Sequence, residues 1–89
     1  MRKYLCKGAL VKATQGRESG ELFIILNDDS EYAYLANGKT RTILQPKKKN
    51  KKHLYLIKKS EDVGLNLEGL TDAHIIKYIK DYNKSRDYK

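Results

Sequence analysis

The chain has 89 residues, of which 19 are lysine or arginine and 11 are aspartate or glutamate, so its formal net charge at pH 7 is +8. A chain this short forms one domain and buries only about 60 to 65% of the surface that its unfolded form exposes. Few residues remain for a buried active site, so we expect a single domain, residues 1–89, that is not an enzyme.

The N-terminus gives no sign of export or of a membrane anchor. Residues 1–7 are basic but lack the apolar run of a secretion signal. No later segment approaches the roughly 20 apolar residues that cross a bilayer. The single cysteine, Cys6, excludes an internal disulfide and a cysteine cluster for zinc. We therefore expect a cytoplasmic protein with no membrane partner, no metal and no cofactor.

Two strands are predicted next, at 8–14 and 22–26, on either side of a polar loop. The second is a short, continuous apolar run rich in isoleucine, which is typical of a strand buried on both faces. The loop, residues 15–20, is framed by Gly16 and Gly20. Because glycine tolerates positive φ, such a loop can turn sharply and bring its amides close to another surface.

A hairpin is predicted after this pair. Following a turn at 27–30, strands 31–36 and 39–44 meet across Asn37-Gly38, the dipeptide best suited to a type I′ turn. Pro46 ends the second strand because it has no amide hydrogen to donate. The lysine run that follows is too strongly self-repelling to pack, so we expect an exposed basic loop there.

The rest of the chain predicts one more strand and a helix. Residues 53–58 supply the fifth strand, and five short strands with tight turns indicate a small, strongly curved barrel that closes its own edges. From Thr71, a candidate N-cap, apolar residues recur at helical spacing. The fold class is therefore mostly β: a five-stranded barrel at 7–59, a linker at 60–70, one C-terminal α-helix at 71–84 packed on the barrel, and a frayed tail at 85–89.

Positive charge is concentrated in one part of the chain, because residues 46–59 contain seven lysines and no acid. A solvated loop without a specific role is one explanation. We favour nucleic acid as the partner, because phosphates would relieve the self-repulsion of the lysines and release condensed counterions.

Other polar and aromatic side chains extend this candidate surface. Arg17 can contact phosphate or stack on a base, although Glu18 and Glu21 beside it oppose a purely electrostatic role. Lys39 and Arg41 either extend the basic surface or protect a sheet edge. Tyrosines on a barrel face can stack on unpaired bases or form half-buried core, and we expect the latter for at least one of the pair Tyr32 and Tyr34.

The segment 8–25 resembles a KOW motif, with Gly8, Gly16 and Gly20 in the motif's glycine positions. Residues 34–41 and 46–54 are in turn similar to a family of small bacterial KOW-domain RNA-binding proteins, relatives of the fourteenth large-subunit protein of eukaryotic and archaeal ribosomes. The resemblance covers about residues 7–57. It implies an SH3-like barrel that binds structured RNA, above all ribosomal RNA, through the KOW loop and adjoining basic segments.

One departure from the family concerns the loop. An aspartate and a lysine often precede its second glycine, whereas this chain has Glu18 and Ser19 there.

Together these features predict a non-enzymatic RNA-binding protein, ribosomal or ribosome-associated, whose partners are ribosomal RNA and ribosomal proteins, with no catalytic residues and no small-molecule substrate. An SH3-like module that recognises acidic or extended peptide segments is the alternative. The expected RNA-binding residues are Gln15, Gly16, Arg17, Lys39, Arg41, Lys47, Lys48, Lys49, Lys51, Lys52, His53 and Tyr55.

Overall fold

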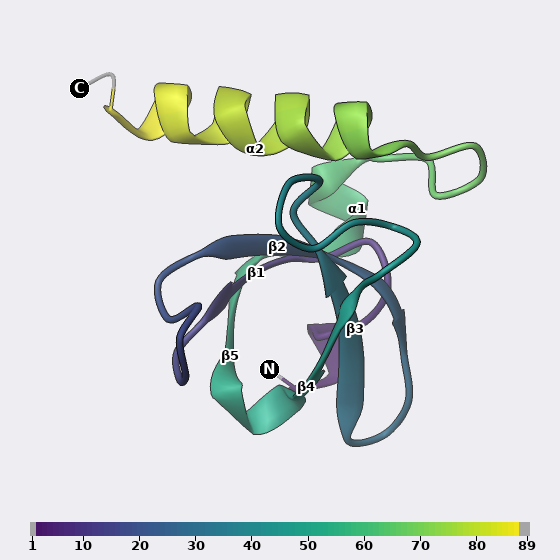
Figure 1. The fold of residues 1–89 in the computed structure, drawn as a ribbon, viewed down its shortest axis with the longest axis vertical. Coiled ribbons are helices and arrows are strands. Elements are labelled where there is room, and N and C mark those ends of the chain that lie inside the picture. Colours follow the sequence, from purple (N-terminus) through teal and green to yellow (C-terminus); the bar gives the residue numbers. More distant parts are fainter. Residues whose placement is uncertain (1, 88–89) are drawn as a thin grey trace.

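The computed structural model describes residues 2–87 as a curved antiparallel sheet with a long C-terminal helix across one end (Figure 1). The elements, in chain order, are η1 (Arg2–Tyr4), β1 (Leu10–Ala13), β2 (Leu22–Asp28), β3 (Tyr32–Ala36), β4 (Lys47–Asn50), η2 (Lys51–His53), β5 (Leu54–Lys58), α1 (Ser60–Val63) and α2 (Asp72–Asp87). The mostly β fold with one main C-terminal helix is therefore confirmed.

The five strands form one sheet in the order β4-β3-β2-β1-β5. The register shifts between Leu10 and Val11 in the β1–β5 ladder, and again between Ile25 and Asn27 in the β2–β3 ladder. Such irregularities bend a strand and increase its twist, which gives the sheet the curvature of an SH3-like barrel (Figure 1). Its outer strands β4 and β5 are joined through η2, but no ladder pairs them within residues 2–87, so the expected edge closure is absent there.

The core has two parts, one on each face of β2. Phe23 and Ile25 are buried in the interior of the curved sheet, together with Val11, Leu35 and Leu54. Leu22 and Ile24 belong instead to a second cluster, which includes Leu10, Ala36, Val63 and Ile75. Because Val63 comes from α1 and Ile75 from α2, this second cluster packs the helices onto the sheet. The prediction that this strand is buried on both faces is confirmed.

The predicted hairpin across Asn37-Gly38 is wrong, because residues 39–44 form no strand. A type I′ turn needs positive φ at both central positions. Gly38 has φ of 85°, but Asn37 does not have positive φ. Its side-chain Oδ1 instead accepts the N–H groups of Lys39 and Arg41, at 2.9 and 3.0 Å, which folds this segment into a compact loop.

Gly38 has a different role from the one predicted for it. A Cβ at this position would lie 2.6 Å from the carbonyl oxygen of Asp72 and equally close to the Ile76 side chain. Glycine therefore lets the loop lie directly against the first turns of α2. The Ile43 N–H donates to Asp72 Oδ1 at 2.9 Å and ties the same loop to the start of the helix.

The lysine run occupies the place of the missing strand. Residues 47–50 form β4 and pair with β3, with Lys48 opposite Tyr34 and Lys49 opposite Ala33. The prediction that this run cannot pack is wrong. Successive side chains of a strand point to opposite faces, so neighbouring ammonium groups separate. Two lysines of the run, Lys49 and Lys51, find acceptors within the protein.

Helix α2 starts where the sequence indicates and ends later. Thr71 Oγ1 accepts the N–H of His74, while His74 Nδ1 accepts the N–H of Thr71, both at 3.2 Å, and this reciprocal cap confirms Thr71 as the N-cap. The helix continues to Asp87, so the expected frayed tail is helical at 85–87, and 88–89 lie outside the described residues. The expected linker, 60–70, contains the short helix α1.

The turn between β2 and β3 gives a prediction about acid stability. Asp29 Oδ1 accepts the N–H groups of Tyr32 and Glu31, at 2.7 and 2.8 Å, and these hydrogen bonds hold the pKa of Asp29 below its ordinary value of 3.8. The stabilisation is therefore present above that value and is lost as the pH falls through the lower pKa of the folded state.

We expect Asp29→Asn, which keeps the acceptor but does not titrate, to be less stable than wild type near neutral pH, with the difference shrinking below about pH 4. Thermal unfolding at several pH values measures this. A difference that does not change with pH would contradict it.

Candidate nucleic-acid interface

The candidate site is built around the loop at residues 15–20, between β1 and β2. Gly16 and Gly20 have φ of 87° and 91°, as predicted for a loop that turns sharply. The Gly20 N–H donates to the Ala13 carbonyl at 2.7 Å and closes the base of the loop. Gln15 and Arg17 are exposed on the loop, so their side chains are accessible to a ligand.

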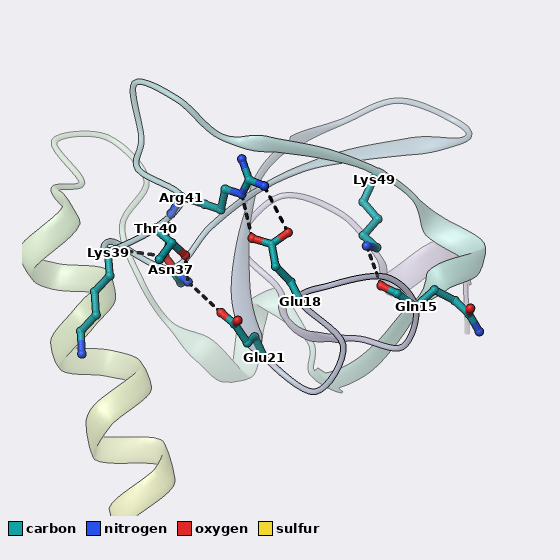
Figure 2. Close-up of polar contacts among 8 residues, drawn as sticks. All are labelled: Gln15, Glu18, Glu21, Asn37, Lys39, Thr40, Arg41 and Lys49. Atoms are coloured by element: carbon teal, nitrogen blue, oxygen red, sulfur yellow. Dashed lines mark hydrogen bonds and ion pairs between the residues drawn. The ribbon is translucent and has the colours of Figure 1, made fainter.

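The loop is fixed on one side by the segment that follows β3 (Figure 2). Arg41 Nε donates to Glu18 Oε2 at 2.7 Å, and Arg41 Nη2 donates to Glu18 Oε1 at 3.5 Å. Asn37 Nδ2 donates to Glu21 Oε1 at 3.3 Å, a second link between the two segments. Glu18 thus pairs with Arg41 rather than with Arg17 or a lysine. The hydrogen bond that Arg41 donates to Glu18 raises the pKa of Arg41, which remains cationic.

Strand β4, which carries the first part of the lysine run, holds the loop from the other side. Lys49 Nζ donates to the Gln15 carbonyl at 2.8 Å (Figure 2). The Thr14 N–H donates to the carbonyl of His53 at 2.9 Å, so η2 also lies against the start of the loop. The structure therefore brings Lys49 and His53 to one side of the loop, and Lys39 and Arg41 to the other.

Lys51 lies apart from these residues. Its ammonium forms an ion pair of 2.9 Å with Asp28 Oδ2, and only 7% of its side chain is exposed. Asp28 is the last residue of β2, whereas the loop precedes the first residue of that strand. Lys51 thus makes a buried structural contact at the opposite end of β2 from the loop.

The remaining predicted residues differ in exposure. Lys52 is exposed and Lys47 is half-buried, while Lys48 is exposed and holds its ammonium 4.5 Å from the centre of the Tyr32 ring. Tyr32 and Tyr34 are both half-buried, as expected for at least one of them. Tyr55 has 52% of its surface exposed and can present its ring to an unpaired base.

A groove of about 730 Å³ lies between the loops and α2, and sequence reasoning missed most of its residues. Lys39 is the one predicted residue in its lining, which also includes Lys12, Glu21, Ile76, Lys80 and Asn83. The spacing of 76, 80 and 83 places these positions on one face of a helix, which was a usable signal. That Lys12 of β1 faces the same groove follows only from the fold.

The side chains of residues 2–87 offer no site for a metal ion. In this part of the chain, no three side chains of His, Cys, Asp or Glu gather closely enough to hold one. No helix there is long and apolar enough to span a bilayer. His74 belongs to the cap of α2.

The separation of Lys51 from the site gives a prediction about stability. Lys51→Ala leaves the Asp28 carboxylate without its buried cation, so the free energy of unfolding should fall by on the order of 3 kcal/mol. Lys52→Ala is the matched control, one residue away and exposed, and should change it by no more than about 0.5 kcal/mol. Urea unfolding monitored by circular dichroism compares the two. Equal effects would contradict the structural role of Lys51.

No protein-family model matches the chain, and no curated protein matches its sequence.

Proposed function

We propose that this is a non-enzymatic RNA-binding protein of the translation apparatus, which binds structured ribosomal RNA at the loop of residues 15–20. The observation that carries the proposal is the convergence of basic segments on that loop. Lys49 contacts its first residue from β4, and Arg41 contacts Glu18 from the segment after β3.

The contacts on both sides of the loop favour binding, because they reduce the entropy lost when it meets a ligand. Gln15 and Arg17 are presented on a backbone that Lys49 and Arg41 already fix. The Arg17 guanidinium suits a phosphate, since its planar fork can make two parallel hydrogen bonds to it. The loop thus offers a preorganised phosphate contact flanked by further cations.

The charge of the whole molecule supports a polyanion as partner. A net charge of +8 attracts nucleic acid over a distance set by the ionic strength. Arg17, Lys48 and Lys52 are exposed cations on or beside the segments that meet at the loop. The likeness to the KOW family directs the proposal toward ribosomal RNA and a cytoplasmic setting.

The proposal predicts a salt-dependent affinity carried by these exposed cations. A triple variant, Arg17→Gln with Lys48→Gln and Lys52→Gln, should bind ribosomal RNA fragments at least about tenfold more weakly at low salt. For every phosphate that the variant no longer neutralises, the slope of log K against log salt should become shallower by about 0.7 to 0.9. Fluorescence anisotropy over a salt series measures both quantities.

Lys77→Gln is the control for that experiment, because Lys77 is an exposed residue of α2 that pairs with Asp81 and belongs neither to the loop nor to the lysine run. Its affinity and slope should equal those of wild type. A wild-type protein that prefers RNA no more than a neutral polymer would overturn the proposal. Native complexes that survive RNase would instead favour recognition of a protein segment.

The backbone of the loop gives an independent prediction. Gly16 has φ of 87°, and a Cβ there would lie 3.2 Å from Lys49 Nζ. Gly16→Val therefore strains the backbone and displaces the Lys49 ammonium from the Gln15 carbonyl. We expect the variant to remain folded but to bind RNA more weakly. Gly64→Val is the control, because Gly64 has φ of 72°, open space around it and a place at the end of α1. Both should lose roughly 1 to 2 kcal/mol of stability, and equal losses of RNA affinity would contradict a special role for Gly16.

A further inference from the structure

We propose that α2 completes the binding surface, and that the groove between α2 and the sheet receives one unpaired nucleotide of the bound RNA. This inference rests on the proposed function and adds to it a second point of contact. It assigns roles to Lys12, Lys80 and Asn83.

The groove collects positive charge from three separate elements. Lys12 comes from β1, Lys39 from the loop after β3, and Lys80 from α2. Glu21 is the one acid in the described lining, and it already accepts a hydrogen bond from the side chain of Asn37. The lining therefore holds three ammonium groups against one carboxylate, a balance that favours a phosphate.

The other lining groups suit the remainder of a nucleotide. Leu22, Ile76 and Ile79 supply apolar surface against which a base or a ribose can pack. Asn83 carries an amide, which can both donate to and accept from a base edge or a 2′-hydroxyl. An acidic peptide would also use the lysines, so it serves as the competing ligand in the test.

The size of the groove also favours a single nucleotide. Its volume of about 730 Å³ falls in the range of about 300 to 1,000 Å³ that is usual for sites that hold small ligands. Proteins read RNA mostly at loops and bulges, where an unstacked base can turn out of the helix. A bulged nucleotide is thus the occupant that fits both the volume and the mixed lining.

The groove is preformed and continuous with the loop. Gly38 lies against the first turns of α2, and Ile75 of α2 is fully buried. The two walls of the groove, α2 and the sheet with its loops, are therefore held together by packing. Gly20, the last residue of the loop at 15–20, also lines the groove. The Lys39 side chain extends beside α2, on the flank of the loop where Arg41 lies (Figure 2). RNA held by the loop therefore passes directly to the groove.

The test compares two RNA hairpins, identical except that one carries a single-nucleotide bulge. Lys80→Gln should weaken binding of the bulged hairpin roughly threefold to tenfold and reduce its salt slope by about 0.7 to 0.9, with little effect on the paired hairpin. Asn83→Ala should weaken binding of the bulged hairpin without changing the slope. Lys77→Gln, on the same helix but outside the groove lining, should behave as wild type with both.

Lys39→Gln tests the opposite wall and keeps the inference falsifiable if a change in α2 disturbs the helix. Amide resonances of Ile76, Ile79 and Lys80 should shift when the bulged hairpin is added to wild-type protein. If wild type binds both hairpins and the Lys80 and Lys39 variants bind them equally well, the inference is wrong and the proposed function stands. If wild type binds neither hairpin nor ribosomal RNA fragments, the proposed function fails. Shifts caused by an acidic peptide and not by RNA would overturn the assignment of the nucleotide.

Discussion

The burial of β2 on both faces is the constraint on which the rest of the structure depends. Phe23 and Ile25 fill the curved interior of the sheet, while Leu22 and Ile24 face the helices. A strand exposed on one face would leave α2 without an apolar surface to cover, and its own stripe is too narrow for a stable isolated helix. Burial of Ile75 against this strand therefore positions the helix, and the helix in turn forms one wall of the groove.

The sequence was sufficient to predict the structure wherever the local pattern and the tertiary packing agree. The apolar run of β2, the glycines of the loop and the cap at Thr71 each express a local preference that the fold keeps. It was insufficient at Asn37-Gly38, where the dipeptide favours a hairpin but the Asn37 side chain caps its own loop and Gly38 lies against α2. The contacts of Gly38 with a helix more than thirty positions later in the chain cannot be recognised from the dipeptide itself.

The lysines of residues 47–52 show that prediction of the candidate site from sequence is limited in the same way. The run alone predicts self-repulsion among the lysines of 47–52, whereas Gln15, Asp28 and Tyr32 each supply a contact for one of them. Those residues lie on other elements, so the division of the run into structural and exposed lysines depends on the fold. The same holds for Lys12 and Lys80, which are ordinary surface lysines in sequence and meet across the groove only in three dimensions.

Ion pairs within the protein do not reduce its net positive charge, and this connects stability with binding. Each pair, such as Arg41–Glu18 or Lys51–Asp28, neutralises one base and one acid, so pairing leaves the excess of +8 unchanged. The excess must then be carried by the other cations, and Arg17 and Lys52 are exposed among them. Folding therefore uses Glu18 to position the loop and Asp28 to hold Lys51, and the unneutralised charge remains at the surface. A polyanion that neutralises this charge would stabilise the folded protein by binding it in preference to the unfolded chain.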